Sequence, residues 1–107
     1  DKTIELTRPV INIGRKNTNQ IVINDLRISR NHAQIRRVNA EYIIFDVGST
    51  GGTFINSERV IQHALRSGDV ISLAGFPMIF TMEHSTTGAT AKSSTSEIKN
   101  TPPPEDD

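Results

Sequence analysis

The stretch "ISRNHAQI", residues Ile28 to Ile35, joins a polar cluster to the first residues of a β-strand. Its residues 29–32 supply a hydroxyl, a guanidinium, an amide and an imidazole. From Ala33 onward, apolar and polar side chains alternate, which is the pattern of a half-buried strand. A polar cluster at the entrance to a strand predicts either a ligand site or a structural brace.

Short segments of the same β-type recur along most of the chain, separated by pieces rich in turn residues. No stretch has the period of a long amphipathic helix. The predicted strands comprise residues 3–6, 10–14, 21–24, 33–38, 42–47, 53–56, 59–61, 69–73 and 77–82. Many short strands at this spacing predict an all-β fold, either a sandwich or a Greek-key barrel.

The composition divides the chain into a folded part, residues 1–83, and a tail, residues 84–107. The tail is rich in Ser, Thr and Pro, has almost no large apolar residues and ends in the acidic sequence "EDD". Such a segment cannot bury enough apolar surface to offset its chain entropy. We therefore expect the tail to be disordered.

Length, charge and cysteine content limit the possible functions. A chain of 107 residues predicts one domain, and twelve Lys and Arg balance twelve Asp and Glu, so no global charge indicates a nucleic-acid or membrane binder. The absence of cysteine excludes disulfides and thiolate metal sites. Charge is nevertheless uneven, because residues 8–37 carry seven cations and one acid, Asp25, which indicates an anionic ligand.

Three polar loops supply donors suited to a phosphate dianion. One loop begins with Gly14 and Arg15, and an arginine presents a planar fork of donors. The second contains Ser29 and Arg30, and the third, "GSTGGT", adds hydroxyls and glycines that let backbone amides approach a ligand. Together these loops predict a binding site at one end of the β fold.

Catalytic, nucleotide-binding and metal-binding functions are disfavoured. The glycine-rich loop lacks the Gly-Lys-Ser/Thr ending and the following helix of an NTPase. Ser29 and His32 are too close on an extended segment to form a nucleophile pair and have no carboxylate to orient them. His63 and His84 are isolated, so no metal ligand set exists. We expect no enzyme activity and no cofactor, and we interpret His32 as a buried structural residue.

The motifs "IGR", "SRNHA", "DVGSTGGTFIN" and "LRSGDVISL", in this order, closely resemble the forkhead-associated (FHA) domain family. The resemblance spans roughly Ile11 to Phe80, nearly all of the predicted fold. It implies an FHA-type β-sandwich of about eleven short strands that binds phosphothreonine peptides through loops at one end.

The resemblance also implies roles for individual residues. Phosphothreonine-binding positions are Arg15, Ser29, Arg30 and Thr50. Positions with mainly architectural roles are Gly14, His32, Gly52, Thr53 and Asn56, while Asn31 and Gly51 belong to the peptide-facing loops. Where the family commonly has Asn-Gly-Thr, this chain has Gly51 in place of the asparagine that often holds the peptide backbone.

The sequence therefore predicts a non-enzymatic module that recognises phosphothreonine in a protein, with the substrate of an intracellular Ser/Thr kinase as the expected partner and no direct contact with nucleic acid or membrane. The alternative is an FHA-like interaction or oligomerisation domain that no longer needs phosphate. The reason to consider it is Gly51, which replaces the asparagine that often holds the peptide backbone. A further hypothesis concerns the tail: if Thr95 is phosphorylated, it would become a ligand for a second copy and cause self-association.

Overall fold

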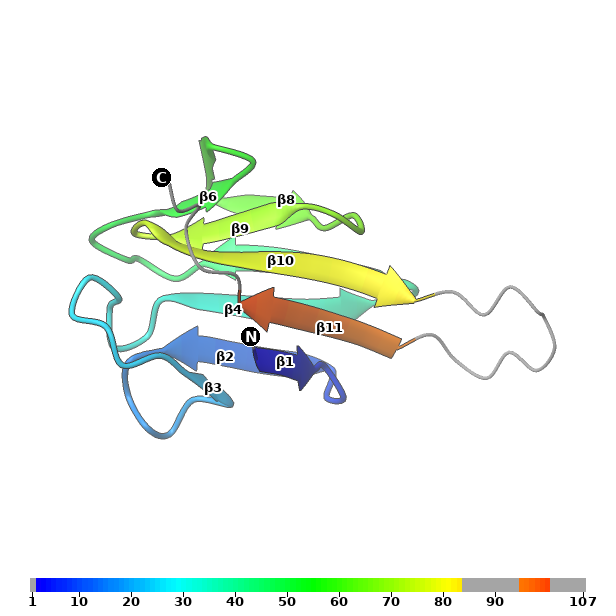
Figure 1. Cartoon of the computed structure of the whole chain (residues 1–107), viewed down its shortest axis with the longest axis horizontal. Helices are drawn as coiled ribbons and strands as arrows, with labels where there is room; N and C mark the ends of the chain where they lie inside the picture. The colour runs from blue at the N-terminus through cyan, green and yellow to red at the C-terminus, as the bar shows by residue number, and fades with distance from the viewer. Residues whose placement is uncertain (1, 84–94, 101–107) are drawn as a thin grey trace, which may run out of the picture.

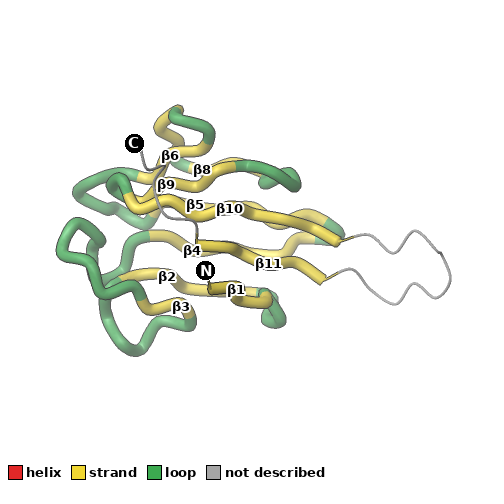
Figure 2. The backbone as a smooth tube through the Cα atoms, viewed as in Figure 1, coloured by secondary structure: helices red, strands yellow, loops and turns green. Residues whose placement is uncertain are grey.

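Two β-sheets make up the computed structural model, which describes residues 2–83 and 95–100 (Figure 1). Figure 2 shows strands joined by loops throughout this part of the chain, and no helix in it is long and apolar enough to cross a membrane. The strands are β1 (Lys2–Glu5), β2 (Val10–Gly14), β3 (Ile21–Val22), β4 (Ala33–Val38), β5 (Glu41–Asp46), β6 (Thr53–Ile55), β7 (Glu58–Val60), β8 (Gln62–Ala64), β9 (Val70–Leu73), β10 (Phe76–Glu83) and β11 (Thr95–Asn100). The expected FHA-type β-sandwich is confirmed.

The two sheets interleave distant parts of the chain. One has six strands in the order β1-β11-β10-β9-β6-β7, and the other has five in the order β3-β2-β4-β5-β8. Most of the described pairs are antiparallel, whereas β2 and β3 run parallel. This order brings the loops after β2, before β4 and after β5 to the same end of the molecule (Figure 1).

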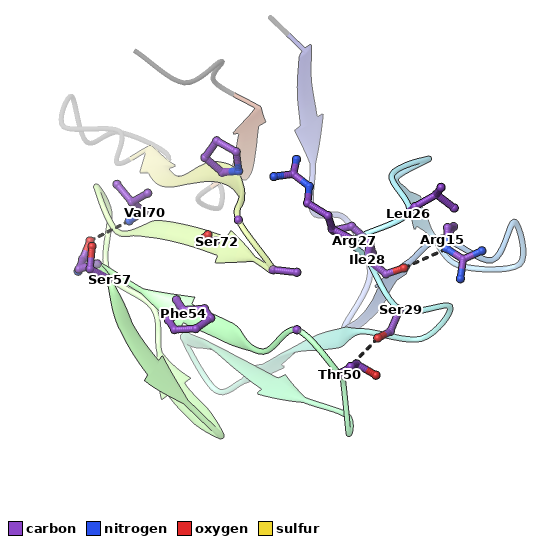
Figure 3. Close-up of a pocket in the computed structure, with 15 residues that line it drawn as sticks. Arg15, Leu26, Arg27, Ile28, Ser29, Thr50, Phe54, Ser57, Val70 and Ser72 are labelled. Atoms are coloured by element: carbon purple, nitrogen blue, oxygen red, sulfur yellow. Dashed lines mark hydrogen bonds between the residues drawn. The ribbon is translucent and has the colours of Figure 1, made fainter. Parts of the chain in front are cut away.

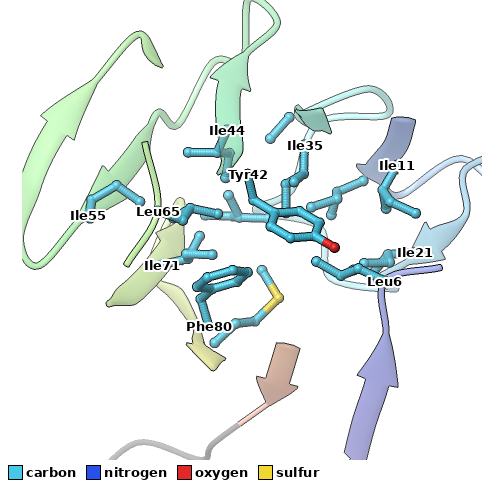
Figure 4. Close-up of a cluster of buried hydrophobic side chains, with 14 of the residues drawn as sticks. Leu6, Ile11, Ile21, Ile35, Tyr42, Ile44, Ile55, Leu65, Ile71 and Phe80 are labelled. Atoms are coloured by element: carbon cyan, nitrogen blue, oxygen red, sulfur yellow. The ribbon is translucent and has the colours of Figure 1, made fainter. Parts of the chain in front are cut away.

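The core lies between the sheets and follows from alternation along the strands. In β9, for example, Ile71 and Leu73 are fully buried, while Val70 and Ser72 point outward. The rings of Tyr42 and Phe80 meet with their centroids 5.7 Å apart (Figure 4). The buried apolar side chains are Leu6, Ile11, Ile13, Ile21, Ile23, Ile28, Ala33, Ile35, Tyr42, Ile44, Ile55, Leu65, Ile71, Leu73, Met78 and Phe80.

Two tight hairpins turn within the six-stranded sheet. Asn56 and Ser57 connect β6 to β7 with φ values of 49° and 74°, and Ala74 and Gly75 connect β9 to β10 with φ values of 50° and 95°. Two consecutive positive φ values are typical of the type I′ turn, which matches the twist of adjacent strands. The predicted strand 53–56 therefore ends one residue earlier, at Ile55.

The C-terminal strand is a departure from the sequence prediction. Residues 84–107 were expected to be disordered, but Thr95–Asn100 forms β11, which pairs with β1 on one side and β10 on the other. Because both edges of β11 make backbone ladders, pairing compensates for a segment with little apolar content. The remaining predicted tail residues, 84–94 and 101–107, lie outside the described residues.

The hypothesis that a phosphorylated Thr95 binds a second copy stays a prediction, and this strand places a condition on it. Thr95 opposes Glu83, and Ile98 opposes both Phe80 and Ile4, so the segment that was expected to be a free peptide is part of the six-stranded sheet. Binding it to a second copy would require β11 to leave both of its neighbours.

The short strand β8 was likewise missed by the sequence prediction, because its three residues carry no apolar alternation.

Candidate functional site

The loops at this end of the sandwich border one open groove, with a volume of about 1280 Å³ (Figure 3). Ligand pockets commonly have volumes of about 300–1,000 Å³, so the groove can hold several residues of an extended peptide. Of the sequence-predicted residues, it is lined by Arg15, Ser29, Thr50, Gly51 and Asn56. The other lining residues are Leu26, Arg27, Ile28, Phe54, Ser57, Val70, Ser72, Ala74, Gly75 and Pro77.

Arg15 enters the groove from the end of β2. Its backbone N–H donates to the Ser29 carbonyl at 3.0 Å, and its Nε donates to the Ile28 carbonyl at 3.0 Å (Figure 3). Within the described residues, no carboxylate forms an ion pair with this guanidinium. The Nε contact fixes the plane of the guanidinium and leaves its terminal nitrogens available to a ligand.

Gly14 makes this placement possible. A Cβ atom at position 14 would overlap the backbone carbonyl oxygen of Arg30, so the end of β2 can approach the next loop only without a side chain. The same carbonyl accepts hydrogen bonds from the Lys16 N–H at 3.2 Å and the Asn19 Nδ2 at 2.9 Å. The loops that carry Arg15 and Ser29 are therefore joined backbone to backbone.

His32 connects the Ser29 loop to the glycine-rich loop. Its ring is fully buried, its Nδ1 accepts the Ser29 backbone N–H at 3.1 Å, and its Nε2 lies 2.8 Å from the Gly52 carbonyl oxygen. Because Nδ1 accepts, the proton of the neutral ring belongs on Nε2 and is donated to Gly52; this tautomer follows from the hydrogen-bond partners. One imidazole thus sets the separation of two loops that line the groove.

Asp46 shapes the glycine-rich loop from beneath. Its carboxylate accepts the hydroxyls of Ser49 at 2.6 Å and Thr53 at 2.7 Å, and the backbone amides of Gly48 and Ser49 at 3.1 Å each. Burial alone would raise the pKa of Asp46, but the hydrogen bonds from Ser49 and Thr53 outweigh it and leave the pKa lowered. Thr53 is fully buried, so its side chain belongs to the framework and not to the groove.

Ser29 and Thr50 are in contact at one side of the groove (Figure 3). The Ser29 hydroxyl oxygen accepts the Thr50 backbone N–H at 3.2 Å, a contact visible in Figure 3. A serine hydroxyl has one proton to donate, and this contact does not use it. The arrangement therefore presents a guanidinium and a hydroxyl proton at one place, which suits an anion with several oxygen acceptors.

Arg30 and Asn31 are not brought into the groove. Both residues are exposed and neither lines it, although Arg30 follows Ser29 directly in the sequence. Arg36 and Arg37, two further cations of the basic N-terminal half, also lie outside the groove. The Arg36 guanidinium lies 5.4 Å from the centroid of the Phe45 ring, and the Arg37 guanidinium lies 5.7 Å from that of Tyr42.

Sequence reasoning missed Arg27, which lines the groove and whose guanidinium lies close to Gly75. Its Nε and Nη2 donate to the carboxylate of Asp25 at 3.0 and 2.8 Å, and these hydrogen bonds lower the pKa of Asp25 to about 2. The pair fixes the direction of the Arg27 side chain while neutralising its charge. In the sequence, only the two-residue spacing of Asp25 and Arg27 indicated that these two side chains could form an ion pair.

Gly51 lies in close contact with the β9–β10 hairpin. A Cβ atom at position 51 would overlap the Cβ of Ala74, and the Ala74 N–H donates to the Gly52 carbonyl at 3.0 Å. The methyl group of Ala74 thus fills the space that an asparagine at position 51 would need. The Ala74 methyl group leaves no room for a side chain at position 51. This contact gives a structural reason why glycine stands where the family commonly has asparagine.

Known proteins have sequences similar to that of this chain. A family model for the FHA domain matches residues 11–74. The oxoglutarate dehydrogenase inhibitor of Corynebacterium diphtheriae is 36% identical over 75 residues, which cover 70% of this chain and 52% of that protein. The chain spans about half the length of the curated relatives it matches.

Solved structures resemble both the fold and the sequence. Mycobacterium tuberculosis EmbR in complex with a low affinity phosphopeptide aligns with a TM-score of 0.69 and 31% identity, covering 71% of this chain and 20% of that chain. The FhaA FHA domain complexed with the intracellular domain of Rv3910 aligns with a TM-score of 0.67 and 28% identity, covering 92% and 86%.

The first prediction concerns the buried imidazole. His32→Ala leaves the Ser29 N–H without its acceptor, which costs about 1–3 kcal/mol, whereas the Gly52 carbonyl keeps its hydrogen bond from the Ala74 N–H. We expect the free energy of unfolding, measured by urea denaturation, to fall by at least about 1 kcal/mol. His63→Ala, which removes a half-exposed histidine from β8, is the control and should change it less. Equal stability of the two variants would contradict the bracing role of His32.

The second prediction concerns Gly51 and Ala74. Gly51→Asn alone should lower the free energy of unfolding, because its Cβ meets the Ala74 methyl group. Ala74→Gly removes that methyl group, so the double variant should recover most of the loss. Coupling between residues in contact is typically about 0.5–3 kcal/mol. Additive effects in this double-mutant cycle would show that the overlap is relieved elsewhere.

Proposed function

The chain belongs to the FHA domain family, and we propose that it recognises proteins that carry a phosphothreonine, with the phosphate bound between Arg15, Ser29 and Thr50. The observation that carries the proposal is the free end of the Arg15 guanidinium, held by its Nε at the mouth of an open groove. A phosphate dianion offers three oxygens to such donors, and charge-assisted hydrogen bonds are roughly twice as strong as neutral ones.

Each residue would have a distinct part in binding. Arg15 would donate its terminal nitrogens to two phosphate oxygens, and Ser29 would donate its hydroxyl proton to a phosphate oxygen. Thr50, exposed beside Ser29, would offer its own hydroxyl. Arg30 would contact the ligand only from the rim, and Asn31 would belong to the loop that carries it. Binding needs no bond to be made or broken, so we propose no enzyme activity and no cofactor.

The partner is proposed at the level of its chemistry. We propose a protein phosphorylated on threonine by a Ser/Thr kinase inside the cell. A relative is named an oxoglutarate dehydrogenase inhibitor, and a structural neighbour was solved with a phosphopeptide. By analogy, we propose that this chain acts by binding a partner and changing its activity. The groove could accommodate the residues that flank the phosphothreonine.

A second candidate function is interaction without phosphate. It is favoured by Gly51, because the family commonly has at this position a residue that holds the peptide backbone. The methyl group of Ala74 occupies the space that the side chain of such a residue would need. The guanidinium of Arg15, which pairs with no carboxylate in the part of the chain that the structure describes, argues against this alternative, because a groove that binds a neutral surface would leave that charge without a counter-charge. A phosphorylated peptide and its unphosphorylated counterpart distinguish the two functions.

The third prediction tests the phosphate site by calorimetry. Removing a charge that pairs with a dianion typically costs about 2–5 kcal/mol, so Arg15→Ala should weaken binding of a phosphothreonine peptide by at least about thirtyfold. The control is Arg36→Ala, which removes an arginine that lies over Phe45 in the five-stranded sheet. Binding of the folded Arg15→Ala protein within threefold of wild type would contradict the assignment, and equal binding of the unphosphorylated peptide would favour the second candidate.

A further inference from the structure

The outer face of the five-stranded sheet exposes apolar side chains away from the groove. Val10 of β2, Val22 of β3 and Val38 of β4 are 40%, 42% and 45% exposed, and Ile43 and Phe45 of β5 are partly exposed. Strand alternation places all five on the side opposite the core, and none of them lines the groove. Apolar side chains grouped on one exposed face indicate an interaction surface.

A row of side-chain hydrogen bonds crosses this face and fixes its polar residues. The Arg36 Nε donates to the Gln34 Oε1 at 2.7 Å, and the Gln34 Nε2 donates to the Asn12 Oδ1 at 2.8 Å. The Asn12 Nδ2 in turn donates to the Gln20 Oε1 at 3.1 Å. Because its Nε is bonded and its guanidinium lies over the Phe45 ring, Arg36 is held in place with its terminal nitrogens available to an acceptor.

The strand residues of this face carry two charges of opposite sign, Arg36 on β4 and Glu41 on β5. In the register of these strands Arg36 pairs with Ile43, and Val38 pairs with Glu41. The four residues therefore form a rectangle with the charges on one diagonal and the apolar side chains on the other. Neither charge forms an ion pair within the part of the chain that the structure describes, so a partner could supply both counter-charges.

We propose that this face binds the same face of a second copy of the chain and forms a two-fold symmetric dimer. In such an interface, residue i of one copy contacts residue j of the other, and the reverse. A two-fold axis that lies between the faces and passes near Val38 and Ile43 brings Arg36 of each copy opposite Glu41 of the other. The same axis places Val38 and Ile43 against their own counterparts.

The charges of the face favour a second copy over a partner of another kind. A partner with charge of a single sign would attract one of Arg36 and Glu41 and repel the other. The side-chain amides have both donors and acceptors, so they also complement one another. Because the formal net charge of the chain is zero, two copies approach without net repulsion.

The size of the face indicates a weak dimer. With five strands about 4.8 Å apart and the longest strands six residues long at about 3.3 Å each, the face measures roughly 20 Å by 20 Å. Two such faces in contact bury about 800 Å² or somewhat more, which is below the ~1,200 Å² of stable complexes. We expect a dissociation constant between about 10 µM and 1 mM.

This dimer would leave both grooves open, because none of the residues that line the groove is on the outer face of the five-stranded sheet. A peptide with one phosphothreonine fills a single groove whether or not the chain is associated, so its affinity does not depend on the dimer. A partner that carries two phosphothreonines would bind both grooves at once and gain avidity. The dimer itself needs no phosphate and does not rest on the proposed function.

The test is sedimentation equilibrium of the 107-residue chain without ligand, over a concentration series that reaches about 1 mM. Wild type is compared with Arg36→Glu, with Glu41→Arg and with an equimolar mixture of these two variants. The matched control is Arg37→Glu, which makes the same change of charge at the next residue of β4, on the other side of the strand. Circular dichroism establishes that each variant is folded.

We expect wild type and Arg37→Glu to form dimers of similar affinity. Arg36→Glu and Glu41→Arg should each raise the dissociation constant at least about tenfold, because each replaces two opposite-charge contacts with two like-charge contacts. The mixture should recover association, since the two exchanged charges then face each other with opposite signs.

Three results would overturn the inference. Wild type that stays monomeric up to about 1 mM would show that the face does not bind a second copy. A dimer that both single variants leave unchanged would lie on another surface. Folded variants that dissociate separately and stay apart when mixed would show that Arg36 and Glu41 do not face each other across the dimer.

Discussion

The hydrogen bonds of His32 connect four parts of the structure at the end that carries the groove. Its backbone N–H donates to the carbonyl of Ile13 in β2, and its carbonyl accepts the N–H of Val47 after β5. Its ring receives the Ser29 N–H and faces the Gly52 carbonyl. Because the side chain is fully buried, water cannot replace these partners, and the positions of the surrounding loops depend on this one residue.

This connection matters for binding because it fixes donors before a ligand arrives. Ordering a loop or a long side chain during binding costs free energy that a preformed site avoids. The Ile28 carbonyl holds the Arg15 guanidinium, and Ser29 already contacts Thr50. Asp46 holds the loop between β5 and β6 through three hydrogen bonds from Gly48 and Ser49 and a fourth from Thr53 at the start of β6. An arginine on a flexible loop would offer the same charge with less directional preference.

Much of this organisation could be predicted from the sequence. Alternation identified most strands, and the loops that contain Arg15, Ser29 and Thr50 were recognised from the donors they combine. The pairing of strands was not predictable, because it depends on contacts between distant segments. This is why β11 was mistaken for part of a disordered tail. The contact of Gly51 with Ala74 likewise exists only after β9 and β10 form their hairpin.

The most direct test of the account is a nuclear magnetic resonance titration of the isotopically labelled protein with a phosphothreonine peptide. We expect the largest shifts at the side-chain Nε–H of Arg15 and at the backbone amides of Ser29 and Thr50. The Nε2–H of His32 should remain observable and bonded throughout the titration. Shifts confined to the outer face of β4 and β5, around Arg36, would contradict the account, because the ligand would then bind away from the loops that His32 holds.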